Sequence, residues 1–187
     1  MSNARAIYLV RHGEAAASWG QSPDPGLSEL GHSQAKETAQ QLEAHLSAPG
    51  VTLVSSPLLR AQETAIPLAA ALGLEVSVDE CFREIPSPVP LDERQDWLRG
   101  FMRQQWHEQE PALHQWRQNI VDAVESLSGT TIVFTHFLVI NALVGWYQKR
   151  EETLVFWPDN ASVTVLDDST GSLAVRSLGK QMSSVVN

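Results

Sequence analysis

Three short, continuous apolar runs along the chain predict buried strands. They cover residues 6–10, 51–54 and 131–134, and β-branched or aromatic side chains are frequent in all three. Residues 75–78 are a candidate for a fourth, shorter strand. Since each of the three long runs is followed by a helical pattern, the chain reads as alternating strands and helices.

The helical patterns have recognisable starts and ends. Ser28 can cap a first helix whose apolar residues recur on one face, and a second helix is expected to start at Ser56-Pro57 and run towards Gly73. Two further helical patterns cover roughly residues 92–105 and 111–127.

The remaining segments predict a loop and a hairpin. Residues 81–90 contain three prolines, which predicts an irregular surface loop. Residues 162–166 and 173–178 flank the turn sequence at 168–171 and predict a hairpin at a sheet edge. We therefore expect residues 1–187 to form a single α/β domain. Its central sheet is mostly parallel, with helices on both faces and an antiparallel C-terminal edge.

Charge and cysteine content narrow the classes of partner. The 187 residues carry 22 acidic and 13 basic side chains, a formal net charge of −9, which argues against binding to nucleic acid or to an anionic membrane. Cys81 is the only cysteine, so no intrachain disulfide can form and a cytoplasmic location is expected. No apolar stretch approaches transmembrane length.

The residues that follow the predicted strands carry the candidate chemistry. Arg11 and His12 come directly after the first strand, Arg60 follows the second at a short distance, and His136 follows the third. In open parallel sheets, ligands bind beyond the carboxyl ends of the strands. We therefore expect two arginines and two histidines at one sheet edge, as a local basic cluster on an acidic chain.

This set of side chains suits phosphoryl transfer. Guanidinium groups match the geometry of phosphate oxygens, and catalysis of phosphoryl transfer is mostly positioning and electrostatic stabilisation. Arg11 and Arg60 are expected to lower the pKa of His12, which keeps the imidazole neutral and nucleophilic, and the Gly13 carbonyl could fix its tautomer. Cations stand where metal-dependent phosphatases place carboxylates, so we predict that neither a metal nor another cofactor is needed.

A leaving alkoxide needs a proton, and the middle of the chain offers several carboxylates. Glu84 in the proline-rich loop is the predicted general acid for the first step and general base towards water for the second. Asp79, Glu80 and Glu93 lie nearby in the sequence as alternatives.

Four ordered blocks carry a resemblance to a known family. They are Arg11-His12-Gly13-Glu14, Leu27-Ser28-Glu29-Leu30-Gly31 with Gln34-Ala35, the run from Ser55 to Ala65, and Thr135-His136. Together they resemble the histidine phosphatase superfamily, also called phosphoglycerate mutase-like, over nearly the whole chain. The resemblance implies that His12 becomes phosphorylated, that Arg11, Arg60 and His136 hold the phosphate, and that Glu84 is the proton donor.

Three positions depart from the usual pattern of that family and bear on the substrate. Ser18 stands where many members have an asparagine, Phe137 replaces a common glycine, and Pro86 replaces a glycine often found after the acid. Gly13 and Phe137 are expected to contact the substrate together with the basic residues.

Other histidines and aromatic residues have simpler interpretations. Trp116 is expected in the core, whereas the pattern leaves open whether Trp97, Phe101 and Trp106 line a substrate pocket or the core. Four histidines in helical patterns are expected at the surface: His32, His45, His107 and His114.

The predicted function is hydrolysis of a small phosphorylated substrate through a phosphohistidine on His12. A phosphoglycerate mutase-type transferase, a protein phosphohistidine phosphatase and a non-catalytic phosphate-binding module are the alternatives. Ser87 stands six residues after Cys81, where a cysteine-dependent phosphatase needs arginine, and no P-loop motif is present. The substrate, the oligomeric state and the pathway are left open.

Overall fold

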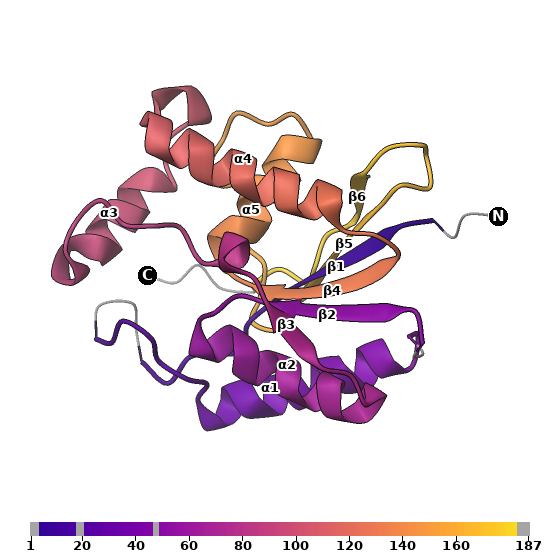
Figure 1. The fold of residues 1–187 in the computed structure, drawn as a ribbon. Helices are drawn as coiled ribbons and strands as arrows, with labels where there is room; N and C mark the ends of the chain where they lie inside the picture. Colours follow the sequence, from indigo (N-terminus) through magenta and orange to yellow (C-terminus); the bar gives the residue numbers. More distant parts are fainter. Residues whose placement is uncertain (1–3, 18–20, 47–48, 183–187) are drawn as a thin grey trace.

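A six-stranded sheet with the order β3-β2-β4-β1-β5-β6 runs through the middle of the protein, as the computed structural model shows for residues 4–17, 21–46 and 49–182 (Figure 1). The strands are β1 (Ala6–Arg11), β2 (Val51–Ser55), β3 (Val76–Val78), β4 (Thr130–Thr135), β5 (Val163–Asp167) and β6 (Ala174–Ser177). The first four pair in parallel, whereas β5 and β6 pair antiparallel at one edge. The predicted single α/β domain with an antiparallel C-terminal edge is confirmed.

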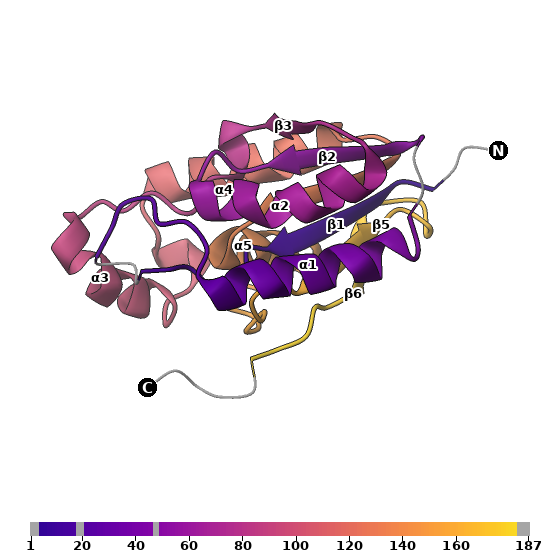
Figure 2. The same ribbon diagram turned by 90° about the horizontal axis from the view of Figure 1, so that it is seen from below.

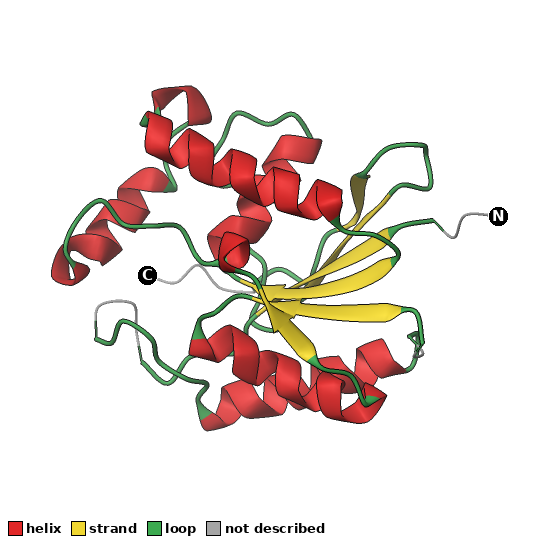
Figure 3. Ribbon diagram, viewed as in Figure 1, coloured by secondary structure: helices red, strands yellow, loops and turns green. Residues whose placement is uncertain are grey.

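Helices cover both faces of the sheet (Figure 3). α1 (Glu29–Glu43) and α2 (Leu59–Leu72) lie on one face and are seen in front of it in Figure 2, while α4 (Pro111–Ser126) and α5 (Phe137–Tyr147) lie on the other. Leu9 belongs to the core cluster that includes residues of α4 and α5, and its neighbour Val10 to the cluster under α1 and α2. Because successive strand side chains point to opposite faces, a continuous apolar strand fills both cores.

The helix ends agree with their predicted signals at two places and differ at a third. The Ser28 Oγ accepts a hydrogen bond from the Gly31 backbone N–H at 3.0 Å, and Gly73 ends α2 with a left-handed φ of 64°. The predicted start of α2 at Ser56-Pro57 is wrong, because the helix begins at Leu59 after an extended Leu58. The hydroxyl of Ser56 has another partner, described below.

The prediction of a surface loop over residues 81–90 is wrong for its first half. Residues Glu80–Phe82 form a 3-10 turn, and the side chains of Phe82 and Ile85 are fully buried. The carbonyl oxygen of Phe82 accepts a hydrogen bond from Thr135 Oγ1 at 2.8 Å. This long-range bond and the buried apolar side chains hold the segment against the end of β4.

The helix predicted over residues 92–105 is shorter than expected. A 3-10 turn (Leu91–Glu93) leads into α3 (Arg94–Phe101). Thr153 donates hydrogen bonds from its hydroxyl and its backbone N–H to the carbonyl oxygens of Phe101 and Gln104. These two carbonyl groups accept hydrogen bonds from Thr153, which lies in a loop far along the chain. The helix therefore does not continue through them.

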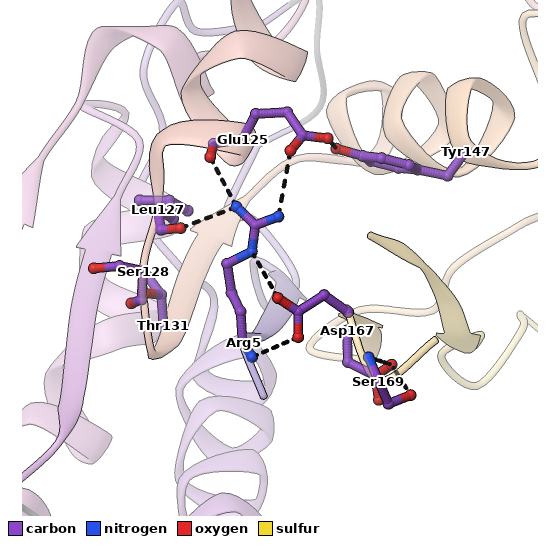
Figure 4. A network of polar contacts seen from close by, with 9 residues as sticks. Arg5, Glu125, Leu127, Ser128, Thr131, Tyr147, Asp167 and Ser169 are labelled. Atoms are coloured by element: carbon purple, nitrogen blue, oxygen red, sulfur yellow. Dashed lines mark hydrogen bonds and ion pairs between the residues drawn. The ribbon is translucent and has the colours of Figure 1, made fainter. Parts of the chain in front are cut away.

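Arg5 ties together three segments at the start of β1 (Figure 4). Its Nη1 donates to the carbonyl oxygens of Glu125 and Leu127 at 2.8 and 3.2 Å, and its backbone N–H donates to Asp168 Oδ1 at 2.7 Å. The carboxylate of Glu125 also accepts from the Tyr147 hydroxyl at 2.8 Å. This network joins β1 to the end of α4 and to the β5–β6 turn. It lies at the amino end of β1, whereas His12 follows the carboxyl end of the same strand.

Candidate active site

The register of the sheet places the two strand-end histidines level with each other. Arg11 pairs with Thr135 across β1 and β4, so His12 and His136 are the next residues on adjacent parallel strands. Their ring centroids lie 5.3 Å apart. Both rings are buried, with exposed fractions of 5% and 0%.

The tautomer of His12 follows from its two hydrogen bonds. Nδ1 lies 2.7 Å from the carbonyl oxygen of Gly13, and Nε2 lies 3.2 Å from the Nε of Arg60. A carbonyl only accepts and a guanidinium only donates, so Nδ1 carries the proton and Nε2 holds a lone pair. The contact expected at the Gly13 carbonyl is present.

Burial and neighbouring cations keep both imidazoles neutral. The pKa of His12 is well below 6.5, first because the ring is desolvated and then because Arg11 and Arg60 repel a proton, while the bond to Gly13 opposes the shift. The pKa of His136 is also well below its ordinary value, because of burial and then of His12, Arg60 and Arg11. A neutral His12 is the form that can act as a nucleophile.

The two arginines are buried, and the nearest opposing charge that acts on both is that of Glu84. Burial lowers the pKa of Arg11 to about 10 and also lowers that of Arg60, while the charge of Glu84 opposes both shifts. Arg11 donates from Nη1 to the Pro158 carbonyl at 2.8 Å, and its guanidinium lies 5.1 Å from the Phe137 ring centroid. Within the described residues, neither guanidinium has a carboxylate at ion-pair distance. Buried, unpaired cations favour an anionic ligand.

Ser56 is a site residue that sequence reasoning missed. Its hydroxyl lies 2.7 Å from Nε2 of His136, and its backbone N–H donates to the Phe134 carbonyl at 2.9 Å. Nδ1 of His136 has no hydrogen-bond partner among the described residues. The available signal was the position of Ser56 directly after β2, next to the end of β4.

Thr64 and two glycines fix the loop after β1. Thr64 Oγ1 accepts from the Gly13 backbone N–H at 3.0 Å and donates to the Arg60 carbonyl at 2.7 Å. A Cβ on Gly13 would lie 2.6 Å from the Gly31 carbonyl oxygen, and one on Gly31 would lie 2.1 Å from the Glu14 carbonyl oxygen. Only glycine at both positions lets the start of α1 approach the loop this closely. Thr64 belongs to the run from Ser55 to Ala65 that carries the family resemblance, but its role was not predicted from the sequence.

Glu84 lies against the same cations. Its side chain is 7% exposed, and its two oxygens accept from the backbone N–H groups of Ile85 at 2.9 Å and Leu138 at 3.3 Å. Burial raises its pKa, although these two hydrogen bonds and the charges of Arg60 and Arg94 oppose that rise. A carboxyl group with a raised pKa is suited to proton donation.

The alternative carboxylates are engaged elsewhere. Asp79 Oδ1 accepts from the Cys81 backbone N–H at 2.9 Å, and Glu80 forms an exposed ion pair with Arg83 at 3.0 Å. Glu93 is exposed in the 3-10 turn before α3. Of the four carboxylates considered from the sequence, Glu84 is the one that is buried beside Arg60.

Two hollows flank these residues. The larger, of about 890 Å³, is lined in part by Arg11, His12 and Phe137. The smaller, of about 330 Å³, is lined in part by Arg60 and Glu84, together with Arg83, Arg94 and Pro86. Both include Ala15. The candidate site therefore lies between two hollows, and Gly13 and His136 line neither.

The open question about the aromatic residues is answered in favour of the core. Phe101 and Trp106 are buried in one hydrophobic cluster, and Trp97 packs against it. None of the three lines either hollow. Trp116 is partly buried and packs against two clusters, as expected.

The four histidines predicted at the surface are exposed: His32, His45, His107 and His114. Ser18 lies outside the described residues.

Neither a metal cluster nor a membrane span is found in the described part of the chain. No group of three or more histidine, cysteine, aspartate or glutamate side chains there is arranged to hold a metal ion. None of its helices combines the length and apolar character needed to cross a membrane.

Curated relatives include proteins named as probable phosphoglycerate mutases. The chain is 35% identical over 125 residues to the probable phosphoglycerate mutase GpmB of Yersinia pestis (strain Pestoides F), which covers 64% of this chain and 51% of the relative. The same values hold for the protein of Yersinia pseudotuberculosis (strain YPIII). The chain thus spans about half the length of the curated relatives it matches.

Solved structures share the fold at low identity. A phosphoserine phosphatase of Entamoeba histolytica in complex with 3-phosphoglyceric acid has a TM-score of 0.75 at 22% identity, covering 95% of this chain and 98% of the other. YhfR of Bacillus stearothermophilus has a TM-score of 0.76 at 23% identity, with coverages of 96% and 98%. A mycobacterial glucosyl-3-phosphoglycerate phosphatase has a TM-score of 0.67 at 24% identity, with coverages of 95% and 100%.

The family profile described as histidine phosphatase superfamily (branch 1) matches residues 7–181, which contain every candidate residue of the site. This chain belongs to the histidine phosphatase superfamily.

Proposed function

We propose that the protein is a metal-independent phosphatase that hydrolyses a small phosphomonoester through a phosphohistidine on His12. The observation that carries the proposal is the state of the His12 ring. Its Nε2 is unprotonated and lies beside Arg60, in a buried setting where no carboxylate of the described residues is at ion-pair distance from either arginine. This arrangement attracts a phosphate and keeps a nucleophile available for it.

In the first step, the Nε2 lone pair of His12 forms a bond to phosphorus while the bond from phosphorus to the leaving oxygen breaks. Arg60 then donates to a phosphate oxygen in place of Nε2, and Arg11 and His136 hold the other oxygens. Protonated Glu84 gives its proton to the leaving oxygen. The raised pKa of Glu84 supports this role.

In the second step, water attacks phosphorus and the bond from phosphorus to Nε2 breaks. The Glu84 carboxylate takes one proton from that water, which restores the acid for the next cycle. Inorganic phosphate and neutral His12 are the products. The fixed Nδ1–H bond to Gly13 keeps the ring in one orientation through both steps.

The names of structural neighbours support a small phosphorylated substrate but do not identify the substrate of this chain. Two of the structural neighbours are phosphatases whose names refer to phosphoserine and to glucosyl-3-phosphoglycerate. The curated relatives are named as probable mutases, but residues 86–91 of this chain lack the basic side chains expected after the acid in a mutase. We therefore favour hydrolysis over transfer to a second hydroxyl.

The test is hydrolysis of 4-nitrophenyl phosphate by purified protein in excess chelator. We expect turnover with the chelator, loss of turnover in His12→Ala, and unchanged turnover in His45→Ala, a matched change at an exposed histidine in the turn after α1. Activity that disappears on chelation, or that survives in His12→Ala, would contradict the proposal. A Glu84→Gln variant that hydrolyses phosphohistidine peptides at the wild-type rate would instead favour a protein phosphohistidine phosphatase.

A further inference from the structure

The larger hollow is bigger than the phosphoryl group requires. Its volume of about 890 Å³ lies at the upper end of the roughly 300–1,000 Å³ found for small-molecule sites. Arg11 and His12 line one part of it, while Gln95, Arg99 and Arg103, from α3 and the turn after it, line another. A phosphate with a three-carbon body would fill only the part beside His12.

The lining also includes several apolar side chains. Phe137 and Trp157 make an edge-to-face contact with centroids 5.4 Å apart, and Trp157 is only partly buried. Other apolar side chains that line the hollow are Met102, Leu154 and Met182. Partly exposed apolar side chains in a cavity are stabilised when an apolar or aromatic ligand covers them.

Two cations stand on the α3 side of the hollow. Arg99 lies in α3 and Arg103 in the turn that follows it, and both line the hollow. Arg99 has an exposed ion pair with Asp96 at 3.2 Å. No side chain of the described residues forms an ion pair or hydrogen bond with the Arg103 guanidinium. Glu14, which also lines the hollow, is engaged, because its Oε1 accepts from the Ser28 hydroxyl at 2.7 Å.

We propose that the substrate is a phosphomonoester of an aromatic or otherwise apolar alcohol with a second anionic group at its far end, and that Arg103 and Arg99 bind that group. The phosphoryl group lies beside His12, the apolar body contacts Phe137 and Trp157, and the distal anion reaches α3. This inference rests on the proposed phosphatase function. The two arginines act here as specificity-determining residues and take no part in the chemical steps.

The test uses non-hydrolysable probes with three different end groups, each at two tether lengths, so that it measures binding without turnover. All carry a 4-(phosphonomethyl)phenyl group on a tether of two or four carbons, which ends in a carboxylate, its methyl ester or a second phosphonate. In calorimetric titrations we expect an anionic probe to bind about three- to tenfold more tightly than the ester, the range for a charged hydrogen bond at a partly exposed site. The carboxylate and phosphonate arms show which anion is preferred.

Two double variants with equal charge loss complete the experiment. Arg99→Gln with Arg103→Gln is expected to remove the preference for the anionic probe and leave binding of the ester unchanged. Arg150→Gln with Arg176→Gln removes two exposed arginines that are absent from the lining, and should keep the preference. Equal binding of all probes at both tether lengths, or a preference that persists without Arg99 and Arg103, would overturn the inference.

The binding experiment and the phosphatase assay can fail independently of each other. If 4-nitrophenyl phosphate is hydrolysed but no probe shows the anion preference, only this inference fails. If the preference is found but no phosphate ester is turned over, the binding site stands and the phosphatase proposal fails.

Discussion

The Nε of Arg60 lies 3.2 Å from Nε2 of His12, so the guanidinium holds the ring nitrogen that the phosphoryl group would occupy. A bound phosphate offers Arg60 a stronger, charged acceptor than a neutral imidazole. Substrate binding is therefore expected to release the His12 lone pair at the moment when phosphorus comes within reach.

Replacing Arg60 with lysine tests this relationship. Arg60→Lys keeps a positive charge but loses the planar fork that reaches His12 and a phosphate together. We expect kcat/KM for an aryl phosphate to fall by about 100-fold or more, as when one preorganised donor is removed. Circular dichroism and thermal unfolding would check that the variant is folded. A loss below about threefold would show that charge alone suffices.

The dependence of activity on pH follows from two opposite pKa shifts. The proposed mechanism needs neutral His12, whose pKa is lowered, and protonated Glu84, whose pKa is raised. Activity should therefore persist to a pH well below 6.5 and fall as the pH rises through the pKa of Glu84, which lies above 4.5. The measurement is kcat/KM against pH.

Glu84→Gln provides the control for that profile. Titration of the substrate phosphate is the same for both proteins, so a difference between their profiles reports on Glu84. In the wild type, kcat/KM should fall at alkaline pH, and we expect this fall to be absent in Glu84→Gln. The variant should also hydrolyse alkyl phosphates roughly 10²- to 10⁴-fold more slowly. Identical profile shapes would exclude Glu84 as the acid.

Gly31→Ala should disturb the loop after β1. The new Cβ would lie 2.1 Å from the Glu14 carbonyl oxygen, so the backbone has to move. We expect a loss of about 1–3 kcal/mol in the free energy of unfolding, typical of overpacking, together with reduced kcat. Gly100→Ala is the matched change in α3, where a Cβ meets nothing within 4 Å, and it should stabilise by up to about 1 kcal/mol. Equal effects of both changes in urea denaturation would contradict the packing argument.

Arg5→Ala should affect stability without affecting turnover. The Arg5 side chain is 20% exposed and donates to two carbonyl groups that would lose their partner. A loss of about 1–3 kcal/mol is expected by chemical denaturation. Arg176→Ala, which breaks only an exposed pair with Asp167, should cost less than about 1 kcal/mol. A changed kcat/KM in Arg5→Ala would argue against the separation of this network from the site.

The positions of Arg11, His12 and His136 could be predicted from the sequence for a simple reason. The apolar runs mark where buried strands end, and parallel strands end at one edge of the sheet. The side chains that come directly after those runs therefore meet, as the 5.3 Å between the two imidazole centroids shows.

The environment of Glu84 could not be predicted from local pattern. Three prolines favour an exposed loop, yet Phe82 and Ile85 are buried, and the Glu84 carboxylate accepts from the backbone of Leu138. Ser56 likewise reads locally as a helix cap, while its hydroxyl lies beside a histidine 80 positions away. Contacts of this kind depend on the packed fold.

The shape of the larger hollow also depends on distant contacts. The sequence shows Arg99 and Arg103 on a helical pattern but does not orient that helix relative to the sheet. The bonds from Thr153 to the end of α3 help to place it, and no local signal announces them.

The most direct test is to trap the reaction intermediate. Protein mixed with substrate and quenched within milliseconds should carry one acid-labile, alkali-stable phosphoryl group, and peptide mass spectrometry should place it on His12. The account predicts that the label is absent from His12→Ala and decays in the wild type as inorganic phosphate is released. A label on another residue, or turnover without any phosphoryl-enzyme, would contradict it.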